Sequence, residues 1–288
     1  MRNWRRITPF LAGLTQQAAR RVLPLGRAAA QRALDIDPSL PEAHAELASA
    51  AVFLDYDWML AEHHFRLAMA RDPVPSTVRH WYGFFYLMPL GRIAEAIDEL
   101  ERSLRDDPLN VMCRTQIAVL NWTAGRYDES DHQFRRAQEL DEHFWLPWLL
   151  SAACLAETNA VVQALTAAER AHALAPSDPG WVGVLAGLLS RLGDSERAGQ
   201  LVLGLRDPGA YGVPLGWQMY HHVRLEFDKA AEWAEKAIEQ RHPSAIPETC
   251  TSARKYFVAA GLWPRLARLL RLPEAVTAPT ASGTIDKP

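Results

Sequence analysis

Residues 77–108 read TVRHWYGFFYLMPLGRIAEAIDELERSLRDDP, and this stretch decides the fold. Its second half carries apolar residues at the helical spacing of three or four, namely Ile93, Ala96, Ile97, Leu100 and Leu104. Gly91 separates that helix from an aromatic first half, and Pro108, which has no backbone N–H, ends it. Gly83 is placed where the two halves meet, because a residue without a side chain lets two backbones approach closely. The stretch predicts two helices that fold back on each other and need neighbours to cover their apolar faces.

A helix-ending position like Pro108 recurs along the chain at intervals of 32 to 35 residues. Asp-Pro pairs mark the first positions, and the full series is Pro38, Pro73, Pro108, Glu142, Pro176, Pro208 and Pro243. Alanine or serine lies five residues before each of the first five, and small residues let helices pack closely. Two helices in a period near 34 residues are typical of a tetratricopeptide repeat. We therefore predict an all-α fold, a right-handed α-solenoid of about six helix-turn-helix repeats with terminal capping helices.

The pattern divides the chain into four parts. Residues 1–24 form a weakly patterned N-terminal segment, and Pro24 suits the first turn of a helix over 25–36. The repeats occupy residues 25–243, and two capping helices are expected within 244–273. Residues 274–288 are rich in Pro, Ala, Thr and Ser, a composition that predicts a disordered tail.

The glycines of repeat five and the apolar residues near the C-terminus lead to two expectations about packing. Repeat five, from Pro179 to about Pro208, contains Gly180, Gly183 and Gly187. We expect it to be loose, because each glycine weakens a helix interior by about 1 kcal/mol. An open solenoid end exposes an apolar face. Repeat six, about Tyr211 to Arg241, has such a face, and four side chains of the C-terminal segment are expected to cap it: Trp263, Leu266, Leu269 and Leu270.

Composition and charge narrow the class of protein. A formal charge of −3 and a pI near 6.4 argue against a nucleic-acid-binding surface, and no apolar run reaches the ~18 residues of a membrane span. The three cysteines are odd in number and far apart, which favours reduced thiols and a cytoplasmic location. Residues 1–14 faintly resemble a signal peptide, but no small-residue cleavage site follows them.

The sequence offers little for catalysis or metal binding. The neighbouring histidines His63 and His64, like His221 and His222, point about 100° apart on a helix and do not share a site. No serine stands in a nucleophile-elbow pattern, and Cys113 has no local base. We expect no catalytic residue, no metal and no cofactor, although a pocket that joined a nucleophile, a base and an orienting group would favour an enzyme.

The chain resembles the tetratricopeptide regions of large bacterial regulators, in which the repeats follow a winged-helix domain, a Ser/Thr kinase or an adenylate cyclase. The segments that carry the resemblance are 28–38, 56–58, 80–82, 107–109 and 263–273. The resemblance covers about residues 20–273 and implies protein interaction without catalytic residues. Two functions follow: a scaffold that binds a partner peptide or domain, or a regulatory module whose effector domain is on another chain or missing.

The resemblance also implies which side chains line the concave groove of the solenoid. They are His80, Phe84, Leu87, Met88, Met112, Thr115, Val119, Trp122 and Leu149. The alternative is that neighbouring repeats cover these side chains. The groove positions lack the Lys, Arg and Asn of a carboxylate clamp, so the resemblance implies an extended or helical peptide held by apolar anchors, with Phe84 and Trp122 foremost. In repeats two to four, two groove positions carry a titratable side chain, and these are His80 and Glu157. The sequence names neither the partner nor the oligomeric state.

Overall fold

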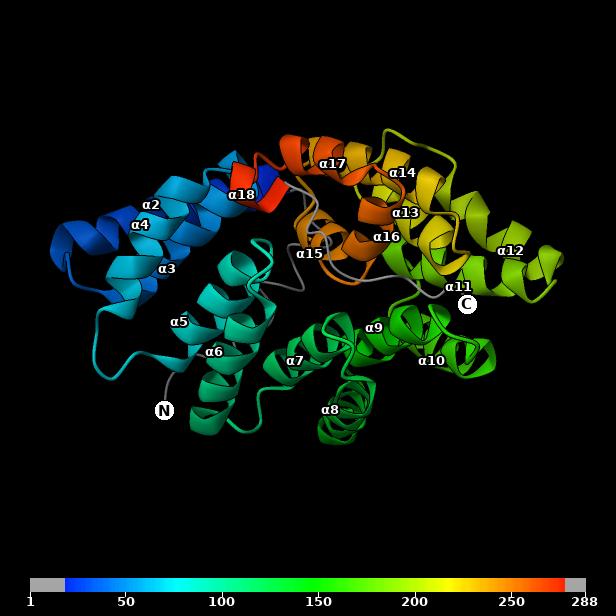
Figure 1. Cartoon of the computed structure of the whole chain (residues 1–288), viewed down its shortest axis with the longest axis horizontal. Coiled ribbons are helices and arrows are strands. Elements are labelled where there is room, and N and C mark those ends of the chain that lie inside the picture. The colour runs from blue at the N-terminus through cyan, green and yellow to red at the C-terminus, as the bar shows by residue number, and fades with distance from the viewer. Residues whose placement is uncertain (1–18, 278–288) are drawn as a thin grey trace.

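The structure is a computed structural model that describes residues 19–277. Within that range every regular element is a helix, and successive helices stack in pairs as an α-solenoid (Figure 1), which confirms the predicted fold class. The elements up to the middle of the chain are α2 (Ala19–Ile36), α3 (Pro41–Ala50), η2 (Ala51–Asp55), α4 (Trp58–Met69), α5 (Ser76–Trp81), η3 (Tyr82–Leu87), α6 (Ile93–Asp106), α7 (Val111–Thr123) and α8 (Tyr127–Leu140). They are followed by α9 (Trp145–Ala156), α10 (Val161–Leu174), α11 (Pro179–Arg191), α12 (Ser195–Val202), η4 (Leu203–Leu205), α13 (Val213–Val223), α14 (Phe227–Glu239), α15 (Ala245–Cys250), α16 (Ala253–Ala259), α17 (Trp263–Leu269) and α18 (Glu274–Thr277).

The stretch 77–108 folds as its pattern predicts. Helix α6 buries Ala96, Ile97 and Leu100 against the preceding helix, and its charged residues face outward except Glu99, which pairs with Arg79 at 2.9 Å. A Cβ atom added to Gly83 would overlap the side chain of Leu100 and lie 3.0 Å from the backbone oxygen of Ala96. Gly83 therefore permits the close approach of η3 and α6.

Repeat five is not loose, and that expectation is wrong. Helix α11 is continuous and mostly buried, and it packs extensively on α13. A Cβ on Gly183 would overlap the carbonyl oxygen of Gly216, and one on Gly187 would lie 2.7 Å from the carbonyl oxygen of Tyr220. The glycines thus let α11 and α13 meet backbone to backbone, and this packing outweighs their low helix propensity.

The ends of the described chain differ from the predicted boundaries. Helix α2 begins at Ala19 and contains Pro24, so a start at residue 25 is wrong. Burial of Leu23 offsets the hydrogen bond that Pro24 cannot donate. At the other end, α18 lies inside the segment expected to be disordered, because the Val276 carbonyl accepts hydrogen bonds from Trp263 and Arg254. Residues 1–18 and 278–288 lie outside the described range.

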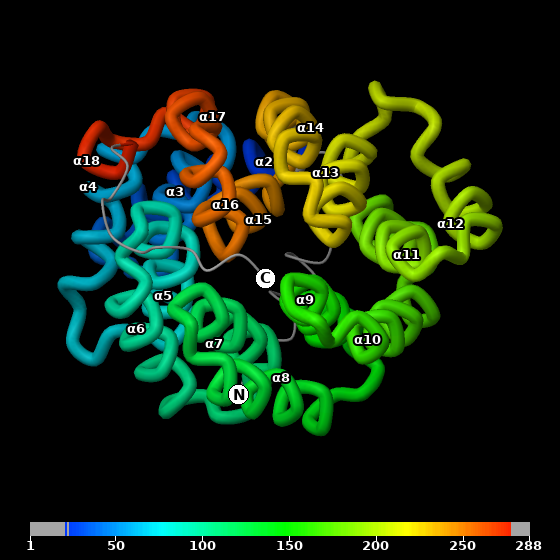
Figure 2. Tube along the Cα trace, turned by 45° about the vertical axis from the view of Figure 1, so that its right-hand side comes forward, coloured from blue at the N-terminus to red at the C-terminus, as the bar shows by residue number. Residues whose placement is uncertain are grey.

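The two ends of the solenoid meet, so that the array closes into a ring (Figure 2). Trp58 Nε1 donates to the Leu270 carbonyl at 2.8 Å, and the Tyr56 hydroxyl donates to the Ile238 carbonyl at 3.1 Å. Helix α17 packs on α14 with Trp263 buried, as the capping pattern predicts. The same segment reaches the first repeat, so it joins two ends of the array.

None of the helices between residues 19 and 277 combines the length and the apolar character that a membrane crossing needs.

Candidate functional site

The concave interior of the ring is the candidate site. The first helices of successive repeats, among them α7, α9, α11 and α13, line it. Figure 2 shows α15 and α16 inside the ring, and both helices pack on α14. The C-terminal segment of the same chain therefore occupies part of the interior.

All nine predicted groove residues are buried. Phe84 is 5% exposed and Trp122 is 6% exposed, so neither is available as a free apolar anchor. An open groove with exposed aromatic side chains is therefore not what the structure shows. Neighbouring helices of the repeats cover several of these residues: His80 bonds to Gln116 of α7, and Trp122 packs against Tyr127 and Phe134 of α8. Partner binding through these residues stays a prediction.

The nine residues fall into different environments. Phe84, Met112, Val119 and Leu149 line an interior cavity of about 120 Å³. The side chains that do not line it are His80, Leu87, Met88, Thr115 and Trp122. The structure thus brings four of the predicted groove residues together around one space.

The polar members of the predicted set are satisfied within the chain. The His80 ring bonds to the Gln116 side chain, and burial lowers the pKa of His80 to about 4, so the ring is neutral at pH 7. The Thr115 hydroxyl donates to the Val111 carbonyl at 2.7 Å. These two groups support the packing of α5 and α7 and present no polar group to a partner.

Glu157, at the C-terminal end of α9, is the polar centre of the concave face. Its side chain is 2% exposed, and it accepts hydrogen bonds or ion pairs from five side chains. These are Trp122 Nε1 at 3.2 Å, His222 Nε2 at 3.1 Å, Lys255 Nζ at 3.2 Å, Tyr256 OH at 3.3 Å and Ser252 Oγ. Three of the five belong to α16 or its N-cap, so Glu157 fastens the C-terminal segment to the solenoid.

These contacts keep the Glu157 carboxylate ionised. Burial by itself raises the pKa of this group, but the hydrogen bond and charge of His222, with Lys255 and Ser252, outweigh it and lower the pKa to about 2. Aromatic stacking adds to the attachment, since the rings of Phe227 and Tyr256 lie 3.9 Å apart and nearly parallel. Helix α16 is therefore held by a charged anchor and an aromatic stack.

The three cysteines are buried within the fold. Burial raises the pKa of the Cys113 and Cys250 thiols to about 12 and that of Cys154 well above its ordinary value, so none is a thiolate at neutral pH. All three cysteines are free. Between residues 19 and 277 no group of three His, Cys, Asp or Glu residues is arranged to hold a metal ion.

Sequence reasoning placed Glu157 on the groove but missed its partners. Ser252, Lys255 and Tyr256 lie in a segment that the pattern identified only as helical. The available signal was the end of the 34-residue register after Pro243, followed by short helices that cannot form another repeat. A helical segment outside the register is free to fold into the concave face.

Two solved structures resemble this fold. One is PilW, described as a widely conserved type IV pilus biogenesis factor, with a TM-score of 0.57 and 17% identity over 72% of this chain and 97% of that chain. The other is PilF of Pseudomonas aeruginosa, with a TM-score of 0.53 and 21% identity over 74% of this chain and 98% of that chain. No model of a known protein family matches the chain, and no curated protein matches it. At these identities the likeness shows the fold, a solenoid of the tetratricopeptide type.

Proposed function

We propose that this chain is a non-catalytic protein-interaction scaffold that binds a helical segment of a partner protein on its concave face, in the place that α16 occupies. One observation carries the proposal: the concave face already holds a helix, and it holds it through a charged anchor, Glu157. A face that binds a helix of its own chain is suited to an equivalent helix of another chain.

The attachment of α16 indicates what a partner helix must carry. Ser252, Lys255 and Tyr256 are spaced i, i+3 and i+4, so they share one face of the helix. They present a hydroxyl, an ammonium group and a phenol to one carboxylate. A partner helix with the same groups at the same spacing reproduces the contacts with Glu157.

The attached helix also sets the condition for partner binding. Because α16 is joined covalently to the solenoid, it competes with an effective concentration in the millimolar range. A free helix of equal affinity for the face therefore binds weakly unless the contacts of α16 are loosened. Lys255 is the accessible member of these contacts, with 41% of its side chain exposed.

A peptide with the sequence of residues 244–261 tests this proposal. We expect it to bind the full-length variant Ser252→Ala/Lys255→Ala/Tyr256→Ala at least tenfold more tightly than it binds the wild-type chain. The three substitutions weaken the attached helix by roughly 0.5–1.5 kcal/mol per lost contact and leave the concave face intact. Fluorescence polarisation of the labelled peptide measures the two affinities.

Two controls accompany the peptide. A peptide with the same three alanines should bind neither protein, because it cannot reach Glu157 with a donor. Adding Glu157→Gln to the variant should remove the gain in affinity. Equal affinity of the native peptide for the wild-type chain and the variant would show that α16 is fixed core, and the proposal would fail.

A further inference from the structure

The interior cavity, of about 120 Å³, lies between α7, α9, α11, α13 and α15 and is partly open to solvent. A protein cavity of about 150 Å³ takes up benzene, so this space suits a ligand of five or six non-hydrogen atoms. The cavity does not depend on the partner-binding proposal, because it exists with α15 and α16 in place.

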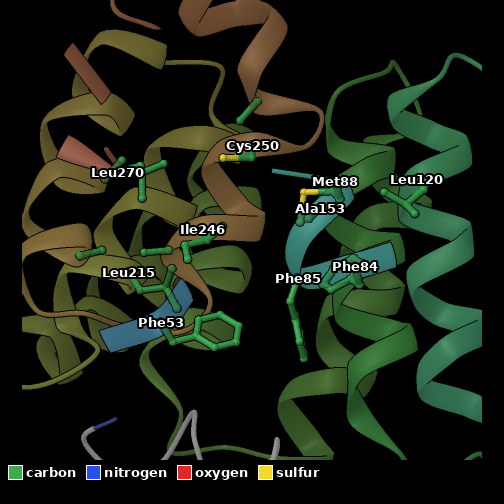
Figure 3. Close-up of a cluster of buried hydrophobic side chains, with 14 of the residues drawn as sticks. Phe53, Phe84, Phe85, Met88, Leu120, Ala153, Leu215, Ile246, Cys250 and Leu270 are labelled. Carbon is green, nitrogen blue, oxygen red and sulfur yellow. The ribbon is translucent and has the colours of Figure 1, made fainter. Parts of the chain in front are cut away.

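Aromatic side chains form much of the cavity wall. Phe53 and Phe85 pack edge to face with ring centroids 4.9 Å apart, and the Trp145 and Trp181 rings lie 4.0 Å apart. Phe84 is the fifth aromatic side chain of the cavity wall. Figure 3 shows the three phenylalanines with the apolar side chains of α9, α13 and α15 around them. Aromatic faces attract cations as well as apolar groups.

One carboxyl group borders this aromatic space. Glu248 of α15 lines the cavity, and within the described part of the chain its carboxyl has no hydrogen-bond or ion-pair partner. The lining among those residues contains neither lysine nor arginine. Glu248 is partly buried, and the desolvation that its position causes raises the pKa of its carboxyl to about 7.

We propose that the cavity is a binding site for a small organic ammonium ion. The apolar body of such a ligand packs against the phenylalanine and tryptophan rings, and its cationic group pairs with Glu248. The ligand thereby supplies a positive charge to Glu248, whereas His222 of the cavity wall is already bonded to Glu157. An anion meets neither lysine nor arginine in the described lining, and a neutral hydrocarbon leaves the Glu248 carboxylate uncompensated.

Two probes of nearly the same shape test the proposal. Tert-butylammonium and tert-butanol each have five non-hydrogen atoms and differ chiefly in charge. Calorimetric titration of the full-length chain at pH 8 should show at least tenfold tighter binding of the ammonium ion. Glu248→Gln keeps the side-chain shape and removes the charge, so this preference should disappear in the variant while binding of the alcohol changes less than twofold.

The pH dependence of the wild-type chain gives a readout that needs no variant. The groups that act on Glu248 are His222 on α13 and Glu157 at the end of α9, and Cys154 of α9 also borders the cavity. Protonation of Glu248 removes the partner of the cation. The ammonium affinity should therefore be level above about pH 7 and fall towards tenfold per unit below it, whereas the alcohol affinity stays level.

Three results overturn the proposal. They are equal affinity for the two probes, absence of binding by both, and an ammonium affinity that does not change with pH. An ammonium preference that persists in Glu248→Gln also contradicts it, because the charge recognised then lies elsewhere.

Discussion

Replacing Glu157 by alanine is expected to lower the free energy of unfolding by about 3–5 kcal/mol, the usual cost of removing one partner from a buried ion pair. The substitution leaves several donors of the concave face without their acceptor, and His222 and Trp122 are themselves buried. It also releases the contacts that hold α16. Chemical denaturation of the wild-type chain and the variant measures the difference.

A surface glutamate provides the matched control for this substitution. Glu139 pairs with Arg136 at 3.0 Å, but its side chain is 63% exposed. Glu139→Ala should change the stability by less than about 1 kcal/mol, because water already solvates both charges. Equal effects of Glu139→Ala and Glu157→Ala would contradict the role of Glu157 as an anchor.

The same anchor predicts how acid affects the fold. The pKa of Glu157 is about 2, below its ordinary value of 4.5, so the native state binds the proton less tightly than the unfolded state. The stabilisation by Glu157 is therefore fully present above about pH 4.5 and is lost as the pH falls through about 2. The acid loss of stability should be shallower in Glu157→Ala over that window.

Gly183→Ala is the second substitution with a large expected effect, a loss of about 3 kcal/mol or more, at or above the upper end for overpacking. The added Cβ overlaps the carbonyl oxygen of Gly216, and a backbone atom cannot rotate away as a side chain can. Helices α11 and α13 must separate to admit it. Thermal or chemical unfolding measures the loss.

Gly199 serves as the control for this second substitution. It lies inside α12, where an added Cβ meets nothing within 4 Å in the described chain. Gly199→Ala should therefore stabilise the protein by about 0.5–1 kcal/mol, because alanine favours the helix. If Gly183→Ala were also neutral or stabilising, the close approach of α11 and α13 would be incorrect.

The sequence was sufficient to predict those features of the fold that depend on local residue patterns. The spacing of 32 to 35 residues between positions such as Pro73 and Pro108 predicted the solenoid, and the apolar stripe around Leu100 predicted the buried face of α6. Gly83 was placed correctly at a helix contact. Each of these conclusions uses residues within one repeat or at one fixed period.

The closed ring depends on contacts that no local pattern shows. Tyr56 and Ile238 are 182 residues apart, and Trp58 and Leu270 are 212 apart. Their meeting reflects small rotations summed over all repeats, which the sequence does not display. The sequence left open whether neighbouring repeats cover the predicted groove positions. The structure shows that these positions are covered, for example by α7 at His80, and that the C-terminal segment also enters the interior of the ring.

The glycines of α11 show the same limitation on a smaller scale. Low helix propensity suggested a loose repeat, whereas the missing side chain of Gly183 permits a backbone contact with a helix 30 residues or more away. Glu157 is a related case, because its partner Tyr256 is 99 residues further along the chain. Propensity and periodicity do not report such tertiary partners.

The central claim is that the solenoid closes on itself with its concave face occupied by its own C-terminal segment. The most direct test is the nuclear Overhauser effect from the indole N–H of Trp58 in the intact chain. The account predicts cross-peaks from this proton to Leu270, whose carbonyl it bonds at 2.8 Å, and slow exchange of the proton with solvent. A Trp58 indole that exchanges rapidly and shows no contact with Leu270 would indicate an open superhelix and would contradict the account.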